Sequence, residues 1–145
     1  MTFYANYQLY LNFQGNTEKA FIFYQSIFGG EFIGGINRFS DTHEGDNLPE
    51  NERDKVMHIA LPIGDRNVIM GTDALESMNQ TVEQGNNFYI SIQADSKEQA
   101  DQYSNGLSDE AEIEMEMQNM FWGDYFGMLT DKFGIKWMVS FSENS

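Results

Sequence analysis

The pattern that most constrains the fold is a hairpin signal in the last third of the chain that also occurs in its first half. Residues 125–141 hold two apolar, strand-like segments around the turn Asp131-Lys132-Phe133-Gly134, which predicts a β-hairpin. Residues 56–72 follow the same plan around Gly64-Asp65-Arg66-Asn67. The recurrence indicates two copies of one supersecondary unit, and we expect the copies to build a shared cleft that holds the functional site.

Module one covers about residues 7–72 and begins with a strand and a helix. The strand is predicted at Tyr7–Phe13, and the helix follows Asn16, its expected N-cap, with apolar residues at helical spacing. We expect Gly29-Gly30 to end this helix in the left-handed conformation.

The middle of module one is less regular. A second strand is predicted at Glu31–Arg38, with a bulge or bend at Gly34-Gly35. Residues 40–54 are polar and acidic, and a loop of this length inside a compact domain is usually functional or disordered. We expect this loop to hang over an edge or the mouth of the sheet. The hairpin of residues 56–72 then completes a β-α-β-β-β order.

Module two repeats this order over about residues 86–142, after a linker at residues 73–85. Its elements are a strand at Asn87–Ala94, a helix opened by the capping box Asp95-Ser96-Lys97-Glu98, a strand at Ala111–Met117 and the last hairpin. The third element alternates strictly between apolar and acidic residues, which predicts a half-buried strand. We expect Glu112, Glu114 and Glu116 to form its solvated face.

The predicted fold class is α+β, with two tandem β-α-β-β-β modules that form a curved mixed sheet. Neither module can bury both faces of its sheet alone, so we expect them to pair around a concave cleft with the helices outside. At 145 residues, the chain fits a single domain that spans residues 1–145.

Composition excludes several classes of partner and chemistry. With 23 acidic and 8 basic residues the formal net charge is -15, which argues against nucleic acid and anionic membranes, since both need a positive protein face. The chain has no cysteine, which excludes disulfides and thiolate chemistry. Its first residues do not contain a basic stretch followed by an apolar run, and no run of about 18 apolar residues occurs. We therefore expect a cytoplasmic protein.

Four motifs together resemble the vicinal-oxygen-chelate superfamily, and more narrowly its PhnB-like branch. They are Tyr10-Leu11-Asn12-Phe13-x-Gly15-Asn16, Ala20-Phe21-x-Phe23-Tyr24-x-x-x-Phe28-Gly29-Gly30, Met57-His58-x-x-Leu61-x-Ile63-Gly64-Asp65 and Trp122-Gly123-x-Tyr125-Phe126-x-x-x-x-Asp131-x-Phe133-Gly134-x-x-Trp137. The superfamily contains glyoxalase I, bleomycin-resistance proteins and extradiol dioxygenases. Members of the branch often carry a demethylubiquinone methyltransferase name, but this chain lacks a Gly-rich strand-to-helix turn for a methyl-donor nucleoside, so we do not expect that activity.

The resemblance also implies where a divalent metal would bind, with one ligand on the first and last strand of each module. The corresponding positions are Gln8 or Leu9, Met70, Tyr89 and Met138. A methionine thioether is a soft ligand that does not suit Zn, Mg, Fe(II) or Mn. We therefore expect no metal and no other cofactor, with a site built around His58 as a minor alternative.

Strand alternation selects the residues that would line the cleft. The candidate ligand-binding residues are Gln8, Tyr10, Asn12, His58, Trp122 and Tyr125. The alternative for each is a place in the core, which we expect for Trp137. No catalytic residue is identifiable, since the chain has no cysteine and no Gly-x-Ser-x-Gly motif.

Three functions fit these features. The leading hypothesis is a small-molecule-binding protein with an unknown ligand, for example a drug-sequestering protein like the bleomycin-resistance proteins. The alternative is a metal-dependent, glyoxalase-like lyase or isomerase for a small carbonyl compound, which would need His58 with Gln8 or Tyr89. An interaction module has no positive feature behind it. The resemblance implies a homodimer, and the predicted edge strands Glu31–Arg38 and Ala111–Met117 would favour it.

Overall fold

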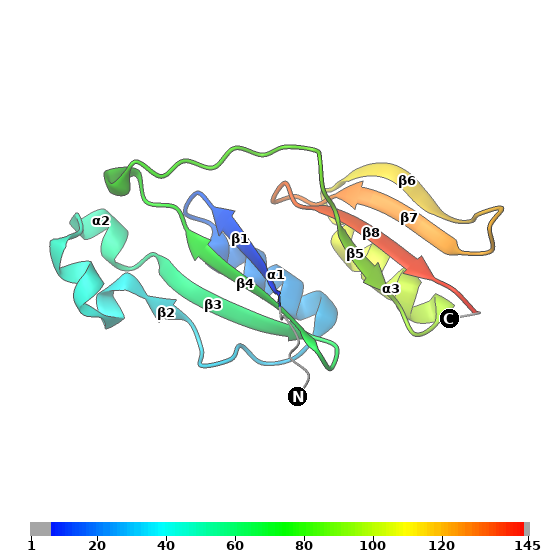
Figure 1. Cartoon of the computed structure of the whole chain (residues 1–145), viewed down its shortest axis with the longest axis horizontal. Helices are drawn as coiled ribbons and strands as arrows, with labels where there is room; N and C mark the ends of the chain where they lie inside the picture. The colour runs from blue at the N-terminus through cyan, green and yellow to red at the C-terminus, as the bar shows by residue number, and fades with distance from the viewer. Residues whose placement is uncertain (1–6, 144–145) are drawn as a thin grey trace, which may run out of the picture. The chain divides into compact units, whose positions relative to one another are not determined.

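The protein folds as two compact units that divide between Glu83 and Gln84, and each unit is described here by itself (Figure 1). The structure is a computed structural model that describes residues 7–143. Each unit contains one four-stranded mixed sheet and one long helix. None of the helices within residues 7–143 has the length and apolar character needed to cross a membrane.

The first unit has the strand order β1-β4-β3-β2, in which β1 runs parallel to β4 and the other pairs are antiparallel. Its elements are β1 (Leu9–Phe13), α1 (Thr17–Phe28), β2 (Asn37–Arg38), η1 (Phe39–Asp41), η2 (His43–Asn47), α2 (Glu50–Arg53), β3 (Val56–Ile63), β4 (Asn67–Asp73) and η3 (Glu76–Met78). The predicted hairpin of residues 56–72 is therefore confirmed.

The second unit has the equivalent order β5-β8-β7-β6, with β5 parallel to β8. Its elements are β5 (Ile90–Gln93), α3 (Lys97–Leu107), β6 (Glu112–Asn119), β7 (Tyr125–Thr130) and β8 (Lys136–Phe141). Both units thus follow the β-α-β-β-β order, which confirms the α+β class and the tandem repeat. The single domain and the cleft between the modules stay predictions.

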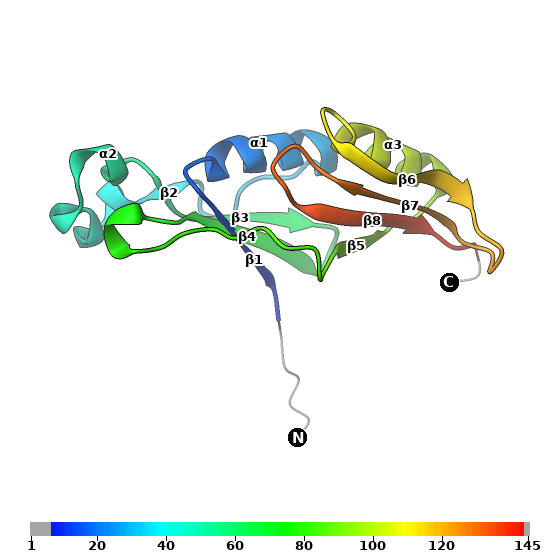
Figure 2. The same cartoon turned by 90° about the horizontal axis from the view of Figure 1, so that it is seen from above.

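In the first unit, α1 covers one face of the sheet by packing on β3 and β4 (Figure 2). Gly71 shows how close this packing is, because a Cβ there would lie 2.6 Å from the ring of Phe21. The ring of Phe13 meets Phe21 edge to face at 6.3 Å. Leu11 and Ile59 pair with Gly71 and are buried on the same face.

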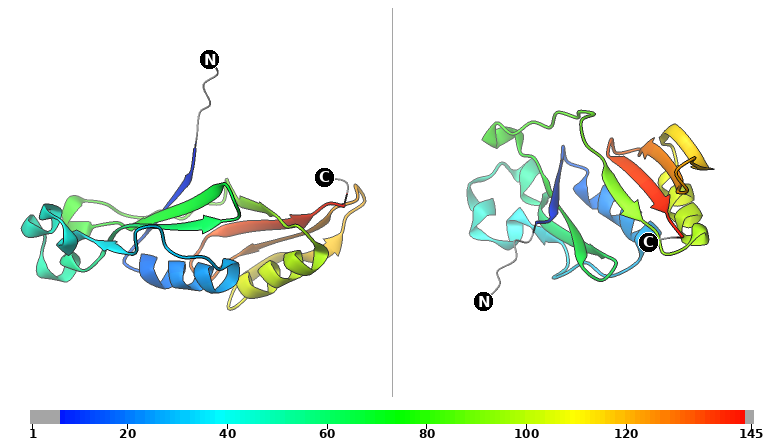
Figure 3. Two further views of the ribbon diagram at one scale, coloured as in Figure 1. Left: turned by 90° about the horizontal axis from the view of Figure 1, so that it is seen from below. Right: turned by 45° about the vertical axis from the view of Figure 1, so that its right-hand side comes forward.

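In the second unit, α3 covers one face of the sheet in the same way by packing on β7 and β8 (Figure 3). Trp137 is 0% exposed on this face, which confirms its prediction as a core residue. Its Nε1 donates to the buried carboxylate of Asp131 at 2.8 Å. The same carboxylate accepts from the backbone N–H groups of Phe133 and Ile135, so one turn residue shapes the β7–β8 hairpin and anchors the core.

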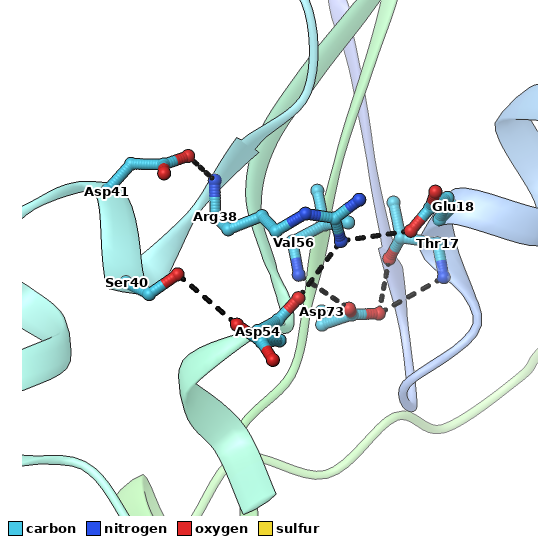
Figure 4. Close-up of polar contacts among 8 residues, drawn as sticks. All are labelled: Thr17, Glu18, Arg38, Ser40, Asp41, Asp54, Val56 and Asp73. Carbon is cyan, nitrogen blue, oxygen red and sulfur yellow. Dashed lines mark hydrogen bonds and ion pairs between the residues drawn. The ribbon is translucent and has the colours of Figure 1, made fainter. Parts of the chain in front are cut away.

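Asp73 plays a comparable part in the first unit, where it is 3% exposed (Figure 4). Its carboxylate accepts from the Thr17 hydroxyl at 2.6 Å, the Thr17 backbone N–H at 3.1 Å and the Val56 backbone N–H at 2.9 Å. Asp73 therefore joins the end of β4 to the first residues of α1 and β3. Asp73 was predicted to lie in the linker, and Asn16 was predicted to cap α1. The Asn16 side chain makes no capping hydrogen bond.

The predicted strand at residues 31–38 is wrong for most of its length. Only Asn37 and Arg38 pair with β3. Gly34 and Gly35 both have a φ of 72°, and the Gly35 N–H donates to the carbonyl of Phe32 in a turn. Two successive residues in the left-handed region bend the chain out of an extended strand. Gly29, which ends α1, has a positive φ as expected, but its ψ of -165° lies outside the left-handed helical region.

The acidic segment of residues 40–54 is mostly exposed, as predicted for a surface loop, but it forms the short helical turns η1, η2 and α2. Leu48 and Glu52 are buried, and Glu52 accepts hydrogen bonds from the backbone and the hydroxyl of Ser77. Arg38 ties the segment to α1, because its Nη1 donates to Glu18 Oε1 at 2.9 Å and to the Asp54 carbonyl at 3.0 Å (Figure 4).

We predict that Asp73→Ala destabilises the protein by about 3 kcal/mol or more, since it leaves three buried donors of Thr17 and Val56 without an acceptor. Urea unfolding followed by circular dichroism measures this loss. The matched control is Asp65→Ala in the exposed β3–β4 turn, which should change the free energy of unfolding by less than about 0.5 kcal/mol. Equal stability of the two variants would contradict the role assigned to Asp73.

Candidate functional site

Each sheet has a second face that its own helix does not cover, which we call the open face. On the first sheet, alternation and register place ten side chains there: Gln8, Tyr10 and Asn12 from β1 and the residue before it, Val68, Met70 and Thr72 from β4, His58, Ala60 and Pro62 from β3, and Asn37 from β2. Gln8, Tyr10, Asn12 and His58 were selected from the sequence, and the structure brings these four together.

The centre of the first open face is a pair formed by Tyr10 and His58. The Tyr10 hydroxyl lies 3.2 Å from His58 Nδ1, within hydrogen-bond distance, and the ring centroids are 5.8 Å apart. Burial raises the pKa of Tyr10 above its usual value, and a hydrogen bond with Thr72 partly offsets this. The phenol therefore stays protonated at neutral pH, while 46% of the residue remains exposed. The pair offers a phenol and an imidazole to a ligand on this face.

His58 belongs to a cross-strand row of polar side chains. Asn12 pairs with Thr72 across β1 and β4, and His58 pairs with Asn37 across β3 and β2. The neighbouring row is largely apolar, since Met70 lies between Tyr10 and Ala60. Gln8 is already engaged, because its Oε1 accepts from the backbone N–H of Val68 at 3.1 Å.

The first open face carries no Asp, Glu, Lys or Arg among its ten residues, although the formal net charge of the chain is -15. Its hydrogen-bonding groups are amides, hydroxyls and one imidazole. A charged ligand placed here would lose hydration without gaining an ion pair from the face itself. The arrangement suits an uncharged molecule with both apolar and hydrogen-bonding parts.

The open face of the second sheet has a different character. Its side chains are Ser91 from β5 and Tyr89 just before it, Lys136, Met138 and Ser140 from β8, Phe126, Met128 and Thr130 from β7, and Glu112, Glu114, Met115 and Gln118 from β6. Glu114 is the centre of a polar cluster there. Its carboxylate accepts from the Thr130 hydroxyl at 2.9 Å, and also from the Lys136 ammonium and the Tyr89 hydroxyl.

These donors lower the pKa of Glu114 from 4.5 to about 2, with the Lys136 hydrogen bond as the largest cause and the Tyr89 hydrogen bond next. The same contact raises the pKa of Lys136. Lys136 Nζ also lies 5.3 Å above the ring of Tyr89. The two charges therefore neutralise each other on the face, and neither is free to recruit a charged ligand.

Glu112 pairs with Thr130, so Glu114 shares its face as alternation predicts, but the sequence did not reveal the contacts of Glu114 with Lys136 and Tyr89. Beyond Ile113, β6 does not pair regularly with β7. Its register shifts between Ile113 and Met115, and again between Met115 and Gln118. A shift of this kind puts two residues opposite one, so faces no longer follow strict alternation. The opposite charge of Lys136 was the available signal, but the sequence did not show that the two side chains meet.

The two remaining candidates, Trp122 and Tyr125, lie in different surroundings. Trp122 is 51% exposed; its Nε1 donates to Asp124 Oδ2 at 3.0 Å and its ring lies 6.3 Å from Phe126 of the second open face. Tyr125 points to the opposite face, where its hydroxyl donates to Asp101 of α3. Tyr125 and Leu129 are separated by an even number of residues along β7, so both lie on the side of the sheet that faces α3. The expectation that Tyr125 faces a cleft is therefore wrong.

The residues at the positions implied for a metal do not fit a hard divalent ion. Gln8 accepts a backbone N–H with its side-chain oxygen, and the Tyr89 hydroxyl is bonded to Glu114. Met70 and Met138 offer thioethers, which hard ions bind poorly. Within residues 7–143 there is no group of three or more His, Cys, Asp or Glu side chains arranged to hold a metal ion.

A hollow of about 240 Å³ lies beside η1 and η2 in the first unit. It is lined by Ser40, Gly45, Asp46 and Arg53. The Arg53 Nε donates to the Leu48 carbonyl at 3.1 Å, so this side chain already supports the local fold. We assign the hollow no functional role.

We predict that the Glu114 cluster makes stability depend on pH in the acid range. A folded pKa of about 2 against 4.5 means that the stabilisation is fully present above about pH 4.5 and is lost as the pH falls towards 2. Carboxyl-detected NMR titration of the wild type should give a midpoint near 2 for Glu114, and Lys136→Met should raise it. The control Lys97→Met, which removes an ammonium near Tyr125 on the helix side, should leave it unchanged. An ordinary Glu114 midpoint in the wild type would contradict the cluster.

Comparison with known proteins agrees with this fold. The family model described as 3-demethylubiquinone-9 3-methyltransferase matches residues 5–140. Protein YjdN of Escherichia coli (strain K12) is 28% identical over 134 residues, which cover 90% of this chain and 91% of YjdN. The crystal structure of protein PA1353 from Pseudomonas aeruginosa is similar with a TM-score of 0.78 and 30% identity, over 94% of this chain and 98% of that chain.

Two further solved structures are similar in fold. The putative 3-demethylubiquinone-9 3-methyltransferase, PhnB protein, from Bacillus cereus has a TM-score of 0.75 and 22% identity, over 95% of this chain and 100% of that chain. A glyoxalase/bleomycin resistance protein/dioxygenase family enzyme from Burkholderia phytofirmans PsJN has a TM-score of 0.61 and 19% identity, over 91% and 95%. The chain therefore belongs to the family described as 3-demethylubiquinone-9 3-methyltransferase, and it shares its fold with the PhnB protein and the glyoxalase/bleomycin resistance protein/dioxygenase family enzyme.

Proposed function

We propose that this protein binds a small, uncharged organic molecule on the open face of the first sheet. The observation that carries the proposal is the Tyr10–His58 pair, which presents two hydrogen-bonding groups on a face without Asp, Glu, Lys or Arg. The half-buried Met70 supplies the apolar part of the surface beside the pair. A few convergent polar groups on a largely apolar surface are typical of small-molecule sites.

The family description names a methyltransferase, but methyl transfer is not the function that we propose. A methyl-donor nucleoside needs a glycine-rich turn between a strand and a helix. The β1–α1 connection is Gln14-Gly15-Asn16, with one glycine, and the β5–α3 connection is Ala94-Asp95-Ser96, with none. Neither connection supports that chemistry.

The metal-dependent lyase or isomerase stays the alternative function, with His58 as its central residue. The observed partner of the imidazole is the Tyr10 phenol, a hydrogen-bonding neighbour rather than a second strong metal ligand. This favours a binding role over a metal-dependent one. A homodimer and a cytoplasmic location also stay predictions, and light scattering tests the dimer directly.

We predict that neutral aromatic fragments bind more often than anionic or cationic fragments of matched size. Ligand-observed NMR with a charge-matched fragment set measures this preference. For the neutral hits, His58→Ala should weaken binding by about tenfold or more and Tyr10→Phe by about threefold to tenfold, as expected for the loss of one hydrogen bond. The control is Tyr7→Phe, since Tyr7 is 91% exposed and lies outside the pair.

Two outcomes would contradict the proposal. In one, the hits are mainly charged molecules. In the other, neutral hits bind the His58→Ala and Tyr10→Phe variants as tightly as the wild type. Circular dichroism of both variants confirms that the fold is retained.

A further inference from the structure

We propose that the open face of the second sheet binds one soft monovalent cation, Cu(I) or Ag(I), through the thioethers of Met115, Met128 and Met138. We call these three residues the methionine row. The inference rests on a different unit and a different set of residues from the proposed function, so either can fail without the other.

The register of the second sheet aligns the methionine row. Met128 of β7 pairs directly with Met138 of β8, and Met115 of β6 pairs directly with Met128. Paired residues on adjacent strands share a face and lie about 5 Å apart, a distance that flexible thioether side chains can bridge to meet at one ion. All three residues are partly buried, so part of their surface stays accessible to an ion.

The remaining methionine of β6 shows that this alignment is selective. The sulfur of Met117 approaches Gly127, which lies on the side of the sheet that faces α3. The register shift before Met115 is what turns this residue to the same face as Met128. Without the shift, β6 would contribute no thioether beside Met128.

The chemistry of these ligands selects the class of ion. Thioethers are soft and uncharged, and they favour Cu(I) over Zn, Mg or Mn. The chain has no cysteine, so no thiolate competes for a soft ion. Met138 occupies a position where the family resemblance implies a hard-metal ligand, and its replacement by a thioether, next to two others, changes the preference from hard to soft ions.

The neighbouring groups are compatible with a cation. On one side of the row, Glu114 and Lys136 are paired, so the ammonium charge is neutralised beside the site. On the other side lies Phe126, whose ring is accompanied by Trp122 at 6.3 Å and offers π-electron density to a cation. The net charge of -15 raises the local concentration of cations around the whole chain.

The test uses Ag(I) as a redox-inert probe, in chloride-free buffer, with the full chain labelled with methyl-¹³C methionine. Single Met→Leu variants assign the methyl resonances, and calorimetry gives the stoichiometry. We expect one equivalent of Ag(I) to shift the methyl resonances of the methionine row. The double variant Met128→Leu/Met138→Leu should weaken binding by at least tenfold, because a single thioether remains.

The control is Met78→Leu, since Met78 is 60% exposed in η3 of the other unit and should not change the affinity. Leucine has nearly the volume of methionine, so the fold should persist. If the double variant does not fold, Met115→Leu on the edge strand carries the same test. The proposal is overturned if Ag(I) shifts other methionines instead, if the variants bind like the wild type, or if no saturable binding occurs.

Discussion

A four-stranded sheet with one helix can bury only one of its faces, and this constraint organises both halves of the protein. In the first unit the covered face is so close to α1 that only glycine fits at position 71, beneath the ring of Phe21. In the second unit Trp137 fills the equivalent layer. The side chains that alternate with these core residues have no helix of their own unit to pack against. They form the surfaces on which we place the ligand and the cation.

Buried carboxylates hold these layers in register. Asp73 accepts three hydrogen bonds from the starts of α1 and β3, and Asp131 satisfies two backbone N–H groups and the indole of Trp137. Each lies at the end of a strand or just beyond it, where backbone donors would otherwise stay unpaired. The open faces are therefore carried by rigid strands, a favourable basis for positioning a few binding groups.

Much of the fold could be predicted from the sequence because its strongest signals are local. Both hairpins are specified by apolar strands around glycine-containing turns, and Trp137 was expected in the core from its place in one of them. Tyr10 and His58 were placed on one face by alternation alone, since β1, β4 and β3 pair without interruption. Regular pairing is the condition under which alternation predicts a shared face.

The errors arise where pairing is irregular or contacts are remote. Met115 lies opposite Met128 only because β6 shifts its register after Ile113, and no local pattern encodes such a shift. Glu114 contacts Lys136 of β8, which is 22 residues away in the sequence. Asp73 was assigned to a linker because its partners, Thr17 and Val56, are distant in the sequence. Tyr125 was predicted on the wrong face. It is the first residue of β7, and the loop before it does not indicate on which face the alternation begins.

The proposed function requires that a small molecule binds on the first open face rather than on the acidic segment or a helix surface. Chemical-shift mapping of the tightest neutral fragment on the labelled full chain tests it most directly. We expect the largest shifts at Tyr10, His58 and the methyl group of Met70. Shifts centred on Ser40 and Arg53, beside the hollow, or on the exposed side of α1 would contradict it.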